Sequence, residues 1–176
     1  RILRSVVRVA AQVKAAELEA RGKLLVLPED KKQPHTSTAS LVRTFVWASK
    51  VLGVPLCDLY VLDDVPLGIA AVQAKAPATA LGPSALSGRS IQELSFLTGR
   101  HLAYYRPEHY ALVFYPSLPE LTTLVVSAVG TELEDVPLPE SATRLRKALD
   151  AGLDEAEKQE LASAVADLEA RGGKMD

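Results

Sequence analysis

Residues 88–110 read GRSIQELSFLTGRHLAYYRPEHY, and this stretch predicts the helix around which the rest of the chain is arranged. Ser90 is followed three residues later by Glu93, the spacing of a capping box in which each residue satisfies a backbone amide at the start of a helix. Pro107 disfavours helical backbone at Arg106, so we predict that the helix ends there.

The chain before this helix alternates helical and strand-forming segments. Apolar residues recur every three or four positions in two segments, which predicts amphipathic helices over residues 2–21 and 40–52. Short apolar runs bounded by Gly, Pro or Asp predict strands: an edge strand over 23–27, a buried strand over 56–62, and one or two strands over 68–82. The polar residues 28–40 lack any periodicity and are predicted to form a loop, which contains His35.

The chain after Pro107 is predicted to be mostly helical. The expected helices cover residues 108–115, 117–129, 140–149 and 154–171, with Gly130 closing the second and an acidic connection over 131–139. The fold class is therefore α+β: a small, mostly antiparallel sheet in the first half, packed by a predominantly helical second half. We expect three parts: a junction helix over 1–22, a core over 23–130 and a C-terminal helical extension of that core over 131–176.

Composition excludes several classes of function. The net charge of −2 over 176 residues gives no basic surplus for phosphates, so no nucleic-acid partner is expected. A single cysteine, Cys57, excludes a disulfide framework and favours a reducing, cytoplasmic setting. Because Cys57 lies in an apolar run, we expect its thiol to be buried and inert. No apolar run approaches the roughly 20 residues of a membrane helix. The chain begins with Arg1 and shows no signal peptide, so we expect it to be part of a larger protein.

The central helix resembles the active-site helix of zinc peptidases, which carries H-E-x-x-H so that two His ligands share one face and the Glu acts as general base. In this chain Arg100 takes the position of the first His, His101 that of the Glu, and Tyr104 that of the second His. His109 matches a trailing His that is not a ligand in that family. The order of the preceding segments, 58–64 and then 67–81, is similar to that of zinc-dependent endopeptidases that process prenylated or misfolded membrane proteins.

A second resemblance covers residues 40–171 and is to an uncharacterised bacterial domain of large multidomain proteins, often beside tetratricopeptide repeats. Both resemblances imply a degenerate, zincin-like scaffold without catalysis. A guanidinium such as that of Arg100 has no lone pair for zinc, and Tyr104 would ligate only as a phenolate, from a pKa of about 10. We therefore expect no catalytic residue, no metal and no other cofactor.

The function that these resemblances imply is a non-catalytic protein-interaction or scaffolding domain that binds a protein or peptide. Its binding surface would be the former substrate cleft, where a peptide adds a strand beside residues 68–81. The residues expected to line that cleft are Arg100, His101, Tyr104, Tyr105 and His109.

Other interpretations of the same residues stay open. His101 shares a helical stripe with Leu94 and Leu97, which is also typical of a hydrogen-bonded core residue. A hydrolase would use His101 with His109 or Glu108. A structural cap of an adjacent helical repeat array would use residues 1–22 as its junction. The aromatic residues gathered around the central helix are interpreted mainly as core residues.

Overall fold

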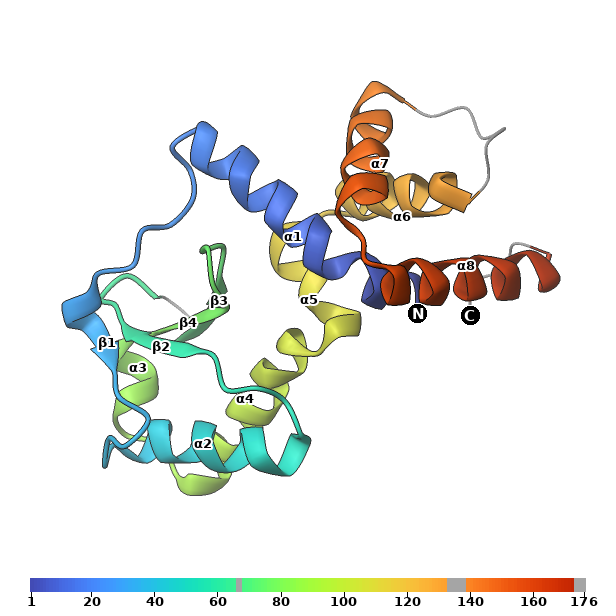
Figure 1. Cartoon of the computed structure of the whole chain (residues 1–176). Coiled ribbons are helices and arrows are strands. Elements are labelled where there is room, and N and C mark those ends of the chain that lie inside the picture. Colours follow the sequence, from blue (N-terminus) through green and yellow to red (C-terminus); the bar gives the residue numbers. More distant parts are fainter. Residues whose placement is uncertain (66–67, 133–138, 173–176) are drawn as a thin grey trace. The chain divides into compact units, whose positions relative to one another are not determined.

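A computed structural model describes residues 1–65, 68–132 and 139–172 of the chain (Figure 1). The chain divides into two compact units, one formed by Arg1–Glu17 with Pro107–Asp176 and the other by Leu18–Arg106. Helix α1 (Ile2–Ala20) begins in the first unit, and its last residues belong to the second.

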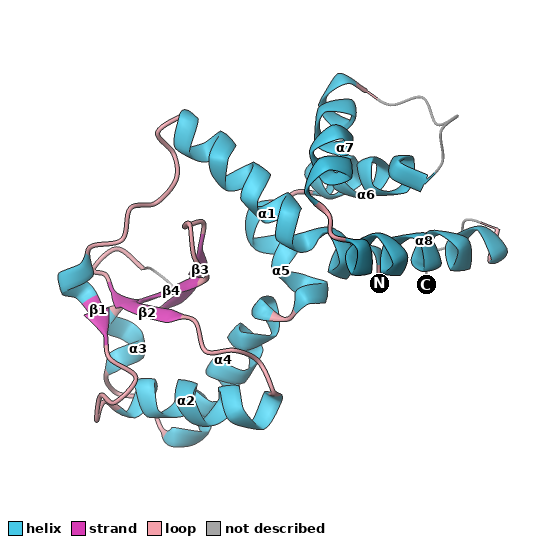
Figure 2. Cartoon of the chain, in the orientation of Figure 1, coloured by secondary structure: helices cyan, strands magenta, loops and turns pink. Residues whose placement is uncertain are grey.

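The unit Leu18–Arg106 holds a four-stranded mixed sheet (Figure 2). Strand β2 pairs in parallel with β4, whereas the outer pairings, β1 with β2 and β3 with β4, are antiparallel. The strands lie in the order β1 (Lys32–Gln33), β2 (Asp58–Val61), β4 (Ala78–Leu81) and β3 (Ile69–Val72). The helices of this unit are α2 (Ser40–Leu52), α3 (Pro83–Leu86) and α4 (Ile91–Leu102), followed by the single turn η2 (Ala103–Tyr105).

The register of β2 against β4 decides which side chains share a face of the sheet. Leu59 pairs with Thr79, and Tyr60 pairs with Ala80. Because successive side chains of a strand point to opposite faces, Thr79 and Tyr60 lie on opposite faces of the sheet. The face of Thr79 packs against α4, where its side chain meets that of His101.

The other unit is helical in its described residues. Its helices are α5 (Pro107–Phe114), α6 (Leu118–Glu132), α7 (Glu140–Gly152) and α8 (Glu155–Ala170), which pack with the first part of α1. The fully buried side chains of this unit include Val6, Phe114, Leu124, Leu149 and Leu161. A small mixed sheet and a helical second half confirm the α+β class.

The segment 23–27 is not the edge strand that its composition predicts. The backbone amides of Lys23 and Leu24 bond back to the Leu18 carbonyl at the end of α1, and the amide of Leu25 bonds to the Gln73 carbonyl, just after β3, 3.0 Å away. The segment therefore forms no strand, because its first two backbone donors complete the end of a helix instead.

Two further predictions are wrong in detail. The predicted loop over 28–40 contains a 3₁₀ turn (Glu29–Lys31) and the edge strand β1. Gly130 does not close α6, which continues to Glu132 with Gly130 buried. The connection predicted over 131–139 lies mostly outside the described residues. Within the described ranges, no helix is both long and apolar enough to span a bilayer.

Candidate functional site

Helix α4 is fixed at both ends by the local signals that its sequence carries. Ser90 Oγ accepts a hydrogen bond from the Glu93 amide at 3.3 Å, and the Glu93 carboxylate accepts from the Ser90 amide at 2.8 Å. The hydrogen bonds that this carboxylate accepts from the Ser90 amide and from the Ser90 hydroxyl hold the pKa of Glu93 below its usual range. At the other end, Arg106 has extended backbone (φ −68°, ψ 141°), as Pro107 requires.

Four side chains of this unit meet in a buried polar group, which we call the Thr79 cluster: Cys57, Thr79, His101 and Tyr105. Thr79 Oγ1 lies at its centre, 2.9 Å from His101 Nε2, 2.8 Å from the Tyr105 hydroxyl and 3.1 Å from Cys57 Sγ. The Tyr105 hydroxyl also donates to the Ala78 carbonyl at 2.5 Å. All four side chains are buried, with exposures of 8% or less.

The positions of the protons in the Thr79 cluster follow from counting donors. A carbonyl only accepts, so the Tyr105 proton points to Ala78, and Thr79 must donate its single proton to the Tyr105 oxygen. The remaining lone pairs of Thr79 then accept from the Cys57 thiol and from His101, which assigns the proton of the neutral imidazole to Nε2. The Cys57 thiol also forms a hydrogen bond with the Tyr105 side chain, and all the groups in the cluster are uncharged.

Burial keeps the Thr79 cluster uncharged. Desolvation, with a smaller contribution from the nearby Arg100 charge, lowers the pKa of His101 to about 4. Desolvation also raises the pKa of the Cys57 thiol. The His101 ring packs edge-on against Phe45 of α2 and Tyr105, with centroid distances of 5.8 and 5.5 Å. These contacts give His101 the surroundings of a core residue, as its helical stripe predicts.

The five residues expected to line a cleft do not share one surface. His101 and Tyr105 are buried, whereas Arg100 and Tyr104 face solvent, with Tyr104 44% exposed. His109 is exposed on α5, which belongs to the other unit. The i, i+4 pair that faces the sheet is thus His101 with Tyr105, one position beyond the pair that the zinc motif would use. The aromatic residues divide in the same way, since Phe96 is 67% exposed while Phe114 is buried.

A groove between α2 and α4 is the feature that the sequence interpretation missed. Its volume is about 380 Å³, and its lining side chains are Ser40, Arg43, Thr44, Trp47, Ile91 and Ser95. Two large apolar side chains of this lining are exposed to solvent: Trp47 is 55% exposed, and Ile91 is 59% exposed. Val51, one turn beyond Trp47 on α2, is 63% exposed. The signal was present in the helical periodicity, because Trp47 and Val51 fall outside the buried stripe of α2.

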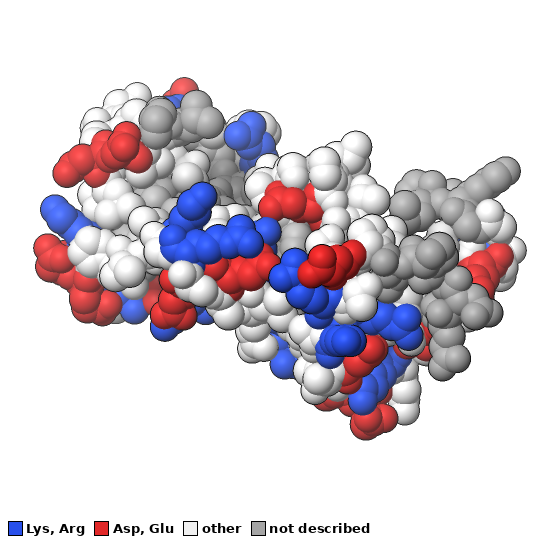
Figure 3. All heavy atoms as spheres, turned by 90° about the horizontal axis from the view of Figure 1, so that it is seen from above, with Lys and Arg blue, Asp and Glu red and all other residues white. Residues whose placement is uncertain are grey.

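The outer side of α2 also carries positive charge. Arg43, Trp47 and Lys50 follow one another at helical spacing and are all exposed. Within the described residues, neither Arg43 nor Lys50 forms an ion pair with an acidic side chain. This local charge contrasts with the face drawn in Figure 3, where acidic and basic side chains are interspersed.

In the part of the chain that the structure describes, no group of three or more His, Cys, Asp and Glu side chains is placed to hold a metal ion. Comparisons with protein-family models, with curated proteins and with solved structures found no match to this chain.

Proposed function

We propose that this chain is a non-catalytic protein-interaction domain on a degenerate zinc-peptidase-like scaffold, and that it acts within a larger cytoplasmic protein. The observation that carries the proposal is the groove between α2 and α4, with Trp47 and Ile91 exposed on its two sides. Large apolar side chains gathered on the surface of a folded unit mark places where another molecule binds. The cytoplasmic location rests on the sequence, through its single Cys57.

The shape and charge of the groove favour one kind of partner, an acidic amphipathic helix. A helix laid between two packed helices inserts apolar side chains at i, i+3 and i+4 spacing, and Trp47 and Ile91 offer the contact surface for them. Trp and Arg are the residues that most often dominate binding energy at interfaces. Because Arg43 and Lys50 have no acidic partner among the described residues, carboxylates on the polar edge of the bound helix would complement them.

The burial of His101 and its hydrogen bond to Thr79 support the non-catalytic part of the proposal. A general base has to reach its substrate within hydrogen-bond distance. His101 is 7% exposed, and its Nε2 is engaged with Thr79. Arg100, at a ligand position of the resembling motif, carries a permanent positive charge that repels a metal cation.

The proposal is tested with synthetic helical peptides that share one apolar face and differ only in an acidic or a basic polar face. Trp47 is the single tryptophan, so its emission reports binding directly. We expect the acidic peptide to bind and shift the emission to shorter wavelength. Replacing Arg43→Glu together with Lys50→Glu should weaken binding at least tenfold, about 1.4 kcal/mol.

Lys31→Glu, which reverses an exposed charge outside the groove, serves as the matched control and should leave the affinity unchanged. Binding of the acidic peptide is also measured by fluorescence anisotropy with Trp47→Ala, which removes the apolar contact. Equal binding of both peptides, or affinity that survives Trp47→Ala, would exclude this groove as the partner site.

A further inference from the structure

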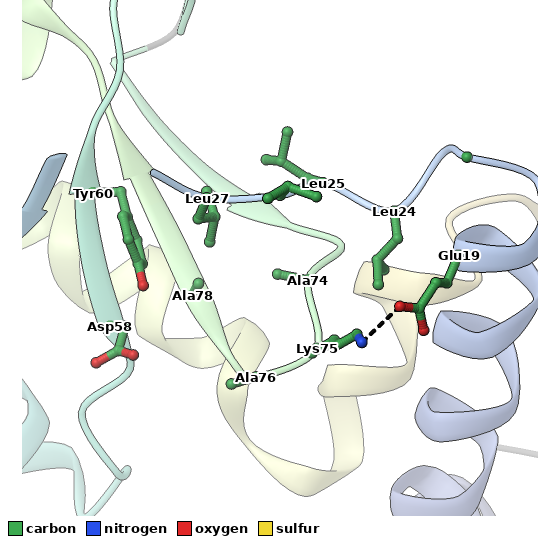
Figure 4. Close-up of a pocket in the computed structure, with 12 residues that line it drawn as sticks. Glu19, Leu24, Leu25, Leu27, Asp58, Tyr60, Ala74, Lys75, Ala76 and Ala78 are labelled. Carbon is green, nitrogen blue, oxygen red and sulfur yellow. Dashed lines mark ion pairs between the residues drawn. The ribbon is translucent and has the colours of Figure 1, made fainter. Parts of the chain in front are cut away.

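A second hollow lies on the face of the sheet that α4 does not cover. Figure 4 shows Tyr60 on β2 and Ala78 on β4, with Leu25 and Leu27 on the segment opposite. The pocket has a volume of about 520 Å³, and it belongs entirely to the unit Leu18–Arg106. Pockets of roughly 300–1,000 Å³ are the size that small organic ligands occupy.

Small side chains line one side of the pocket. Ala74 and Ala76, in the connection between β3 and β4, and Ala78 on β4 have the smallest side chains in this lining, while Leu24 and Leu27 come from the segment after α1. Tyr60, Ala74 and Ala78 form a small buried cluster against which Leu27 packs. The lining is therefore mostly apolar, and the described chain leaves the space itself unfilled.

The charged groups around this pocket already have partners. Lys75 lies 2.6 Å from Glu19, as the dashed line in Figure 4 marks, and Asp58 lies 2.8 Å from Lys32. A charged ligand would lose hydration on entry and meet no unpaired opposite charge in compensation. The pocket therefore disfavours ligands that carry a net charge.

One polar group in the lining is still open to a ligand. Tyr60 is 6% exposed, and within the described residues its hydroxyl has no hydrogen-bond partner. The hydroxyl nevertheless keeps some surface, because the only fully buried side-chain polar atom without a partner in the described residues is Thr98 Oγ1. Buried tyrosines usually satisfy their hydroxyl, so this group is available to a molecule in the pocket.

We propose that this pocket binds an uncharged, mostly apolar small molecule whose single polar group hydrogen-bonds to the Tyr60 hydroxyl. The site lies on the opposite face of the sheet from α2 and α4, so it is independent of the proposed peptide groove. Its ligand contacts β2, β4 and the extended segment after α1 at once.

A matched pair of fluorescent probes tests the size, polarity and place of the ligand. N-phenyl-1-naphthylamine is uncharged, whereas 1-anilinonaphthalene-8-sulfonate has the same ring system with one negative charge. We expect the uncharged probe to bind with a rise in emission and the sulfonate to bind at least tenfold more weakly. Binding of the sulfonate with equal or greater affinity would overturn the proposed ligand class.

Variants locate the bound probe. Ala76 is exposed and lines the pocket, so Ala76→Phe fills the space without entering the core and should weaken the uncharged probe at least tenfold. Tyr60→Phe should weaken it about threefold through loss of the hydrogen bond. Ala151→Phe, at an exposed position of α7, is the control and should have no effect. Absence of probe binding, unchanged affinity in Ala76→Phe, or loss of binding in Trp47→Ala instead would overturn the proposed site.

Discussion

Thr79 Oγ1 and His101 Nε2 lie 2.9 Å apart although the two residues are separated by 22 positions in the chain. The bond joins an inner strand of the sheet, β4, to the helix whose sequence resembles a peptidase motif. The side chain at the position of the catalytic Glu therefore contributes to the stability of the core.

Removing the central hydroxyl should destabilise the unit Leu18–Arg106. Thr79→Val keeps the shape of the side chain but leaves the buried Cys57, His101 and Tyr105 groups without their shared partner. We expect a loss of about 1–3 kcal/mol in the free energy of unfolding, measured by urea denaturation. Thr122→Val, at an exposed position of α6, is the control and should change stability by less than about 0.5 kcal/mol. Equal effects of the two substitutions would contradict the role of the Thr79 cluster.

The stability should fall in mildly acidic solution because of His101. Its pKa is about 4 in the folded chain against 6.5 in the unfolded chain, so the unfolded state binds more protons between these values. Stability is then fully present above pH 6.5 and is lost as the pH falls toward 4. Between pH 7 and pH 5 we expect a loss of about 2 kcal/mol from this residue alone.

The control for this pH dependence is His101→Gln, whose amide can donate to Thr79 but does not titrate. Urea denaturation at pH 7 and pH 5 should show a much smaller difference in this variant than in the original chain. The carboxylates of Glu93, Glu120 and Glu157, whose pKa values are lowered from 4.5, titrate below this window. The same pH dependence in both proteins would assign it to other groups.

The features that the sequence predicted correctly are those set by neighbouring residues. The capping box of Ser90 with Glu93 fixes the start of α4, and Pro107 fixes the extended backbone at Arg106, since both effects act within one helical turn. For His101 the sequence left two interpretations open, a residue lining the cleft and a core residue on the stripe of Leu94, and the buried side chain agrees with the second. Its partner Thr79 was not predicted, because that contact depends on the register of β4 in the sheet.

The features that the sequence missed depend on contacts between distant segments. Strand β1 consists of Lys32 and Gln33, which carry no strand signal, and it forms through pairing with β2 and the ion pair of Lys32 with Asp58. The residues 23–27 have a strand composition, but the backbone amides of Lys23 and Leu24 bond to the end of α1. Likewise, the groove beside Trp47 requires α2 and α4 to lie side by side, which periodicity alone does not specify.

In the helical unit, the Tyr115 hydroxyl should contribute measurably to stability. Tyr115 is 5% exposed, and its hydroxyl donates to the Ala10 carbonyl of α1 at 2.9 Å. Tyr115→Phe keeps the ring, over which Lys14 Nζ lies 5.4 Å from the centroid, and removes only this bond. We expect a loss of about 1 kcal/mol in thermal or urea unfolding. Tyr104→Phe, at a half-exposed ring, should cost less than about 0.5 kcal/mol, and a reversed order would be evidence against the Ala10 bond.

Two glycines should respond to alanine in opposite directions. At Gly82 an added Cβ would lie 2.6 Å from the Val65 carbonyl oxygen and 2.9 Å from its Cβ, and neither atom can rotate away. The backbone of Gly82 (φ −94°, ψ 166°) suits any residue, so the cost is steric, and Gly82→Ala should destabilise by about 1–3 kcal/mol. At Gly99, inside α4, a Cβ would meet nothing within 4 Å, so Gly99→Ala should stabilise by about 0.5–1 kcal/mol through helix propensity. Urea denaturation of the two variants measures both changes in stability. A destabilising Gly99→Ala would mean that α4 packs more closely against its neighbours than the structure shows. A neutral Gly82→Ala would mean that Val65 and Gly82 do not approach each other as described.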